Sequence, residues 1–277
     1  ALIAGLALFM VAPPASADKS GVSPGRLKLP KGPGSLEGVG ENAEPNVNMG
    51  LVGYGVPIGL PGGFPGASPS LRLAYSSGSG QSVVGIGWSL SVPSIERMTS
   101  KGLPSYNRDD LIAANGGDEL VRIPGTNTYR SRYEGSFVRY TWIDQRNRGR
   151  RGMWKAEYPD GNIGWFGAAA DGDVQDQAVV EGRDGIFRWH LVETVDPYGH
   201  RVRYQYEKDG STSLLRRIGY VFENDRPRYQ AELEYEERED HVSDAKPGYD
   251  VRLTKRLRSI VALSRGEQIN RWVLNYE

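Results

Sequence analysis

Three carboxylates lie close together in one segment and could hold a metal ion. The segment reads Asp171-Gly172-Asp173-Val174-Gln175-Asp176, and carboxylate oxygens are the ligands that Ca²⁺ prefers. A calcium loop of the EF-hand type needs glycine at its sixth position and glutamate at its twelfth. This chain has Asp176 and Gly182 there. The spacing therefore favours an ordinary acidic loop, and the sequence predicts no metal site and no cofactor.

A run of arginines could bind phosphate or stack on a nucleobase. It spans residues 146–151, with Trp142 and Trp154 nearby, and arginine beside aromatic rings is typical of single-stranded nucleic acid binding. The whole chain, however, balances 34 Lys and Arg against 34 Asp and Glu, so no global field attracts a polyanion. A solvated loop is favoured, and no nucleic-acid partner is predicted.

Other catalytic chemistry finds little support. The 277 residues include no cysteine, which excludes disulfides, cysteine-ligated metals, a thiol nucleophile and a lipoprotein anchor. The histidines, at 190, 200 and 241, are not spaced as metal ligands. No G-x-S-x-G or phosphate-loop spacing occurs. Acidic pairs for a glycosidase could be chosen from many residues, but a sequence does not set their separation.

The first residues predict export. Residues 1–12 form an uncharged apolar run, followed by Pro13-Pro14 and by Ala15-Ser16-Ala17. This is typical of the apolar region and cleavage site of a secretory signal peptide, here without its start. Residues 1–17 are therefore predicted to be removed, so that a secreted protein without a stable membrane anchor begins at Asp18. A buried N-terminal helix is the alternative, which the proline pair disfavours.

The elements that follow predict an all-β fold. Residues 18–48 are rich in glycine and proline and predict an extended lead-in, and residues 49–277 form a β domain that we expect to continue further. Period-two alternation flanks turn residues repeatedly. The predicted turns are 115–118, 159–162, 196–199, 223–227 and 264–267. The expected architecture is a curled sheet of successive antiparallel hairpins, with almost no helix beyond the signal peptide.

One block of this β domain predicts a core anchor. In Gly85-Ile86-Gly87-Trp88-Ser89-Leu90, the side chains of Ile86, Trp88 and Leu90 alternate, which in an extended strand places all three on one buried face. The two glycines allow the backbone to approach a neighbouring strand closely. Trp88 is therefore predicted to pack in the core.

The same block resembles a known family. Four segments carry the resemblance in order: Leu27 to Gly34, Pro69 to Gly78, Gly85 to Ile95, and Lys101-Gly102-Leu103-Pro104. They resemble the SpvB-type N-terminal domain, which opens the virulence-plasmid SpvB proteins and the B components of Tc insecticidal toxin complexes. The segment Asp196 to Tyr206 is similar to a YD (Rhs) repeat. The motif residues are Gly85, Gly87, Trp88, Leu90, Pro93, Asp196, Gly199, Tyr204 and Tyr206.

The resemblance implies a structural, non-catalytic domain. It would form part of a β shell that encloses or delivers a C-terminal toxin, and its partners would be other toxin-complex subunits or its own C-terminal payload. The alternative is a secreted all-β glycan-binding module or glycoside hydrolase, in which Trp142, Trp165 and Tyr198 would stack on sugars.

Some relatives carry an ADP-ribosyltransferase further along, with an arginine, a Ser-Thr-Ser strand and a Glu-x-Glu turn. This chain contains Arg203, Ser211-Thr212-Ser213 and Glu232-Leu233-Glu234. Ser211 directly follows Asp209-Gly210, so the Ser-Thr-Ser triplet is expected in a turn and not on a strand, whereas the glutamates alternate along one strand face. We therefore interpret the match as coincidental and expect no catalytic residue here.

Overall fold

The computed structural model describes residues 44–46, 51–144 and 152–276. By its internal contacts the chain divides into residues 1–40 and residues 41–277, and every described residue belongs to the second unit. The predicted signal peptide with Ala15 and Ala17, most of the lead-in and the arginine run at 146–151 lie outside the described residues.

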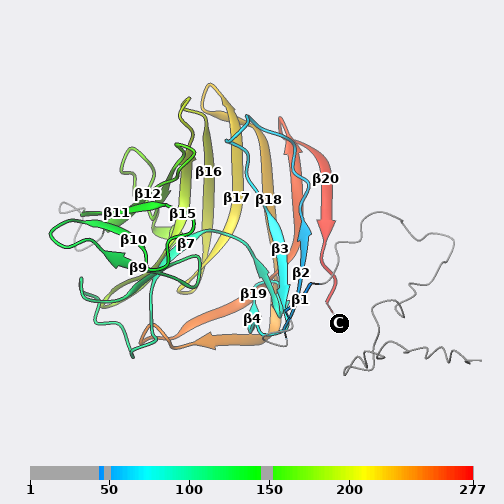
Figure 1. The fold of residues 1–277 in the computed structure, drawn as a ribbon. Coiled ribbons are helices and arrows are strands. Elements are labelled where there is room, and N and C mark those ends of the chain that lie inside the picture. The colour runs from blue at the N-terminus through cyan, green and yellow to red at the C-terminus, as the bar shows by residue number, and fades with distance from the viewer. Residues whose placement is uncertain (1–43, 47–50, 145–151, 277) are drawn as a thin grey trace, which may run out of the picture. The chain divides into compact units, whose positions relative to one another are not determined.

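The described residues are built almost entirely of β-strands, which confirms the predicted fold class (Figure 1). The one helix among them is the short 3₁₀ turn η2 (Asp176–Ala178). A small sheet comes first along the chain. Its strands, in the order β1-β2-β3-β6, are β1 (Glu44–Asn46), β2 (Leu51–Pro57), β3 (Arg72–Ser76) and β6 (Trp88–Leu90). Between β3 and β6 a two-stranded hairpin forms from β4 (Gln81–Ser82) and β5 (Gly85–Ile86).

The middle of the chain forms a closed ring of antiparallel strands. The ring strands are β7 (Ser94–Arg97), β8 (Ile112–Ala114), β9 (Asp118–Arg122), β10 (Thr128–Ser131), β11 (Arg139–Asp144), β12 (Gly152–Glu157), β13 (Ile163–Phe166) and β15 (Gly185–Val195). Each pairs with the next, and β15 closes the ring because it pairs with both β7 and β13. Strand β14 (Val179–Gly182) pairs with β15 beside this closure.

Side chains fill the inside of this ring, as small closed barrels require. Buried residues from every ring strand make one hydrophobic cluster, in which Trp154, Trp189 and Phe166 are the largest fully buried members. The indole rings of Trp142, Trp154 and Trp189 meet edge to face, with centroids 5.1 to 6.2 Å apart. The ring is therefore a packed core rather than a channel.

From β15 the sheet continues as an open meander of long strands. These are β16 (Arg201–Asp209), β17 (Thr212–Glu223), β18 (Arg226–Asp244), β19 (Val251–Ser264) and β20 (Glu267–Val273). A second hydrophobic cluster includes Leu215, Leu233 and Ile260 from these strands and Leu71, together with half-buried Leu73 from the small sheet. The predicted turns all join paired strands, so the expected hairpins are confirmed.

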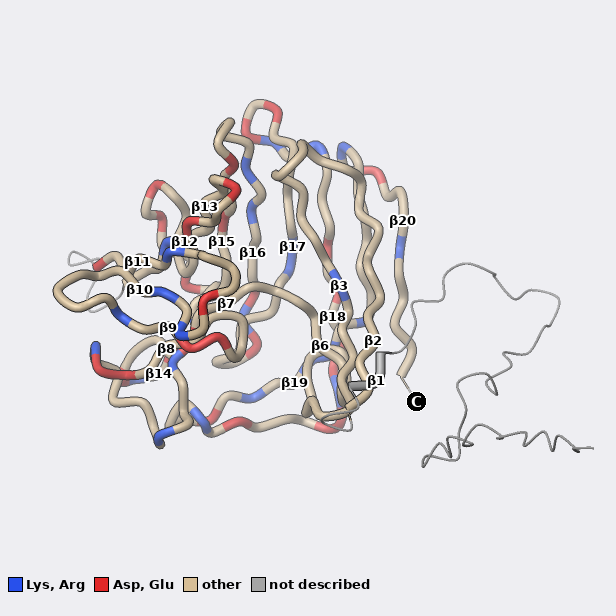
Figure 2. The backbone as a smooth tube through the Cα atoms, in the orientation of Figure 1, with Lys and Arg blue, Asp and Glu red and all other residues tan. Residues whose placement is uncertain are grey.

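Basic and acidic residues are interspersed along the described strands (Figure 2), in agreement with the zero net charge of the chain. Many are cross-strand ion pairs, such as Arg139 with Glu157 and Arg256 with Glu236. Within the described residues, no helix is long and apolar enough to cross a membrane.

Candidate functional site: the signature hairpin and its contacts

Residues 80–90, which include the predicted block at 85–90, form a compact unit, which we call the signature hairpin. Its bends depend on two glycines with positive φ, +102° at Gly85 and +77° at Gly87, a conformation that other residues rarely adopt. A β-carbon on Gly87 would lie 2.5 Å from the ring of Tyr75. The hydroxyl of Ser82 donates to the carbonyl of Trp88, 2.5 Å away, and accepts from the amide of Val84. The side chain of Ser82 therefore links the two sides of the signature hairpin.

The prediction for Ile86 is wrong. Its side chain is 74% exposed, whereas Trp88 and Leu90 are half-buried and pack against the second hydrophobic cluster. The reason is that positive φ at both Gly85 and Gly87 interrupts the extended backbone, so the period-two alternation of a strand does not continue through Ile86.

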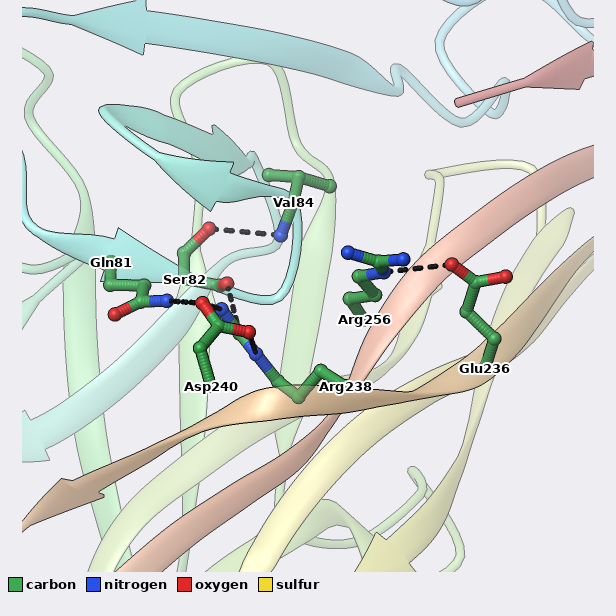
Figure 3. Close-up of polar contacts among 7 residues, drawn as sticks. All are labelled: Gln81, Ser82, Val84, Glu236, Arg238, Asp240 and Arg256. Carbon is green, nitrogen blue, oxygen red and sulfur yellow. Dashed lines mark hydrogen bonds and ion pairs between the residues drawn. The ribbon is translucent and has the colours of Figure 1, made fainter. Parts of the chain in front are cut away.

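An arginine that the motif analysis missed fastens the signature hairpin to the long strands (Figure 3). The Arg238 side chain, 2% exposed, donates from Nη1 to the Ser82 carbonyl at 2.9 Å. Its Nε and Nη2 donate to both carboxylate oxygens of Asp240 at 3.0 and 2.9 Å, and these bonds lower the pKa of Asp240 to about 2. Gln81 also donates to Asp240. This network holds β4 against β18.

The tip of the signature hairpin contacts the next strand as well. The amide of Leu257, on β19, donates to the Val83 carbonyl at 2.8 Å, and Val84 is buried in the second hydrophobic cluster. Beside this contact, Arg256 pairs with Glu236 at 2.7 Å and lies over the ring of Tyr276. The bulge in β18 between Glu237 and Val242 creates the place for Arg238. The period-two pattern of a strand sequence does not reveal such a bulge, so the burial of Arg238 could not be predicted from it.

Trp88 lies where the small sheet meets the long strands. Its ring contacts Tyr75 at 5.3 Å and Tyr54 at 6.1 Å between centroids. Pro93 follows in the link between the small sheet and the ring, and its carbonyl accepts from the Leu191 amide at 3.0 Å. Trp88 and Pro93 thus lie in the segment that leads from the second hydrophobic cluster to the ring of strands.

Substitution of Trp88 by alanine is expected to lower the free energy of unfolding by about 2 to 3 kcal/mol, somewhat less than the roughly 3 to 5 kcal/mol of a fully buried tryptophan. The half-burial of the ring accounts for the difference. Urea unfolding followed by far-ultraviolet circular dichroism measures the midpoint. Ile86→Ala is the matched control, with a change of about 0.5 kcal/mol or less. An unchanged midpoint in Trp88→Ala would remove this residue from the core.

The second motif forms the turn between β15 and β16. One carboxylate oxygen of Asp196 accepts from the amides of Tyr198 and His200 at 2.9 and 2.8 Å, and the other lies 2.8 Å from Nδ1 of His200. Burial alone would raise the pKa of Asp196, but the bonds from His200 outweigh burial and lower it. Gly199 has φ +86°. The His200 ring stacks on Phe64, with centroids 3.7 Å apart.

Tyr204 and Tyr206 follow this turn on β16. Tyr204 packs against both hydrophobic clusters. The Tyr206 hydroxyl donates to the Leu191 carbonyl on β15 at 2.7 Å. The side chains of Tyr204 and Tyr206 therefore connect the closed ring of strands to the long-stranded sheet.

The ADP-ribosyltransferase-like residues do not converge. Arg203 pairs with the buried Glu193 at 3.0 Å. Ser211 lies in a turn, as predicted for the triplet, and its hydroxyl donates to the Asp250 carbonyl. The prediction is wrong for Thr212 and Ser213, which begin strand β17. Glu232 pairs with Arg217 at 2.6 Å. Glu234 accepts from Ser259 and Arg271, and these bonds lower its pKa. The side chains of Arg203, Ser211, Glu232 and Glu234 are each bound by a different neighbour, so they do not form one site.

The aromatic residues of the glycan-binding alternative also lie apart. Trp142 packs on the cluster inside the ring. Trp165 precedes the inward-facing Phe166 and lies beside Lys155, so it belongs to the opposite face of the strands. Tyr198 is 84% exposed at its turn. Among the described residues, no three metal-binding side chains gather at one point. In the acidic loop, Asp171 and Asp173 are engaged in local turn bonds.

The fold and the site together define an all-β domain in which a closed ring continues through β15 into a long-stranded sheet, and the signature hairpin is bound to the long strands. Residues 46–218 match the family model described as SpvB, Salmonella virulence plasmid 65kDa B protein. The chain belongs to this SpvB family, which confirms the resemblance seen in the sequence. It is 28% identical over 202 residues to the mono(ADP-ribosyl)transferase SpvB of Salmonella typhimurium, covering 64% of this chain and 32% of that protein. The chain thus spans about a third of the length of the curated relatives it matches.

Solved structures share the fold. The N-terminal domain of effector protein SpvB from Salmonella typhimurium strain LT2 superposes with a TM-score of 0.66 at 20% identity, covering 76% of this chain and 87% of that one. The TcdB2-TccC3 structure gives a TM-score of 0.76 at 21% identity over 92% of this chain and 16% of that one. The Tc holotoxin pore of Photorhabdus luminescens gives 0.74 at 19% identity, over 94% and 16% of the two chains.

Proposed function

We propose that this chain is the structural, non-catalytic N-terminal domain of a secreted toxin protein related to SpvB and to the Tc toxin B components. It forms part of a β shell that encloses or delivers a toxic C-terminal region. The observation that carries the proposal is the position of the motif residues. The signature hairpin, Tyr204 and Tyr206 all lie where strands and hydrophobic clusters meet. Export through residues 1–17, with cleavage after Ala17, belongs to the same proposal.

The partners that fit this role are other toxin-complex subunits or the payload of the same protein. The sheet supports this proposal through β20, whose side chains Ile269 and Val273 are 53% and 57% exposed. Within the described residues β20 pairs only with β19, and a strand edge of this kind accepts further strands. The similarity of Asp196 to Tyr206 to a YD repeat points to the same architecture.

The experiment uses the full natural protein, its C-terminal region alone and this chain alone. In the full protein, we expect the C-terminal region to resist protease much longer than the same region expressed by itself, because a shell excludes the protease. Equal cleavage rates would contradict enclosure.

The same preparations test the non-catalytic role. This chain alone is expected to transfer no ADP-ribose and to hydrolyse no glycoside or ester. Turnover by this chain that disappears in Glu234→Gln, but persists in the exposed-site control Glu239→Gln, would establish an enzyme instead.

A further inference from the structure

An apolar surface on the outside of the ring of strands is not used by the proposed function. On β9, Leu120 faces the packed inside of the ring, so Val121 and Ile123, which are 47% and 40% exposed, lie on the outer face. Val121 lies opposite Arg130 on β10. The Arg130 guanidinium donates to the carbonyl of Phe137 at 3.2 Å, and the Phe137 side chain is 65% exposed. We call the surface formed by Val121, Ile123, Arg130 and Phe137 the outer patch.

Phe137 adopts a backbone conformation that does not suit its residue type. Its φ is +53°, in the left-handed region that glycine and asparagine adopt most easily and that costs free energy for a bulky residue. The side chain gains little packing in return, because most of it is exposed. A strained residue that presents an aromatic ring to solvent indicates an interaction site rather than a role in stability.

The charges beside the outer patch do not balance. The cations on the outer faces of β10, β11 and β12 are Arg130, Arg139 and Lys155, and Glu157 is the one carboxylate on these described faces. Glu157 accepts two bonds from Arg139, both at 2.8 Å, and one from Lys155 at 3.0 Å. Among the described residues, no carboxylate forms an ion pair with Arg130. A surplus of positive charge therefore lies beside exposed apolar side chains.

A protein partner suits this surface better than a nucleic acid. Val121 and Ile123 are aliphatic and offer no ring on which a base could stack, and a polyanion makes more phosphate contacts than this small surplus of charge could supply. Arginine and aromatic side chains are enriched where proteins contact one another, and complementary charge selects the partner. The partner should therefore bring carboxylates together with apolar side chains.

We propose that the outer patch binds a protein segment in which carboxylates stand beside apolar side chains. One carboxylate pairs with Arg130, and the apolar side chains cover Val121, Ile123 and Phe137. The outer patch belongs to β9, β10 and the turn that follows, far from β20 in the strand order of the sheet. This interaction is therefore separate from the strand edge at β20 and does not depend on the proposed function.

The experiment uses the whole chain labelled with ¹⁵N, and its probe is a capped hexapeptide of alternating glutamate and leucine. We expect the peptide to shift the amide signals of Val121 and Phe137 saturably, with a Kd on the order of 1 mM, while the signal of Phe166 inside the ring stays in place. Peptides of alternating lysine and leucine, or of glutamate and serine, should each bind at least about fivefold more weakly. A short oligothymidylate that binds more tightly than the acidic peptide would identify a nucleic-acid site and overturn the proposal.

Variants test the two features that carry the proposal. Arg130→Gln removes the unpaired charge and should reduce the affinity for the acidic peptide about fivefold. Arg258→Gln, at an exposed position on β19, changes the net charge equally and should leave the affinity unchanged. Phe137→Asn suits the positive φ but removes the ring, so the affinity, followed at Val121, should fall about threefold while the urea midpoint does not decrease. No saturable shift, equal losses in the two arginine variants, or a lower midpoint with unchanged affinity in Phe137→Asn would overturn the proposal.

Discussion

Replacing Trp189 by alanine is expected to lower the free energy of unfolding by about 3 to 5 kcal/mol, the usual range for a fully buried tryptophan. The residue is 1% exposed and contacts both Trp142 and Trp154. It also donates to the Gly152 carbonyl on β12, so the substitution removes a bond across the ring as well as the packing. A loss of this size is a large part of the net stability of a domain.

Urea unfolding of the variant and the wild type measures this loss as a shift of the midpoint, with both unfolding curves compared at the same denaturant slope. Trp165→Ala is the matched control, because this indole lies on the outer face beside Lys155. Its expected loss is about 0.5 to 1 kcal/mol. Similar losses in the two variants would mean that the ring of strands is not the core we describe.

Stability is expected to fall as the pH decreases from about 6.5, because of His190. Neither ring nitrogen of this residue has a hydrogen-bond partner in the described structure. Burial, together with the cations Arg188 and Lys208, lowers the pKa of His190 to about 3. The unfolded chain therefore binds a proton at its ordinary pKa near 6.5, whereas the folded chain does not. Stability from this group is complete above pH 6.5 and is lost progressively between 6.5 and 3.

The expected loss is about 1.4 kcal/mol per pH unit at most, or about 2.5 kcal/mol between pH 6.5 and 4.5. The midpoint of urea unfolding at several pH values measures it. His190→Phe keeps a ring to stack on Tyr206, with which His190 stacks at 5.2 Å, and should remove most of this dependence. His241→Phe, at an exposed position, should retain it. The interpretation fails if His190→Phe and the wild type lose the same stability.

The hairpins could be predicted from the sequence because their causes are local. Residues such as Asn115-Gly116 and Pro197 set the backbone of a turn, and the flanking alternation sets the strands. The same local logic was wrong for Ile86, where two positive φ angles end the alternation. Arg238 was missed because its burial depends on a bulge in β18 and on a carbonyl more than 150 residues away in the chain. Neither the bulge nor the distant carbonyl can be recognised from the residues next to Arg238 in the sequence.

The amino-acid sequence by itself determined the all-β class, the positions of the turns and the SpvB resemblance, since period-two patterns, turn residues and family motifs are read over a few residues at a time. Only the tertiary structure decided that β13 and β7 both pair with β15. This closure brings Trp142, Trp154 and Trp189 together around a cavity. The long strands that follow hold Arg203, Ser211 and Glu234 each with a partner of its own. The physical reason is that pairing between distant strands depends on the packing of whole faces, which no local pattern specifies.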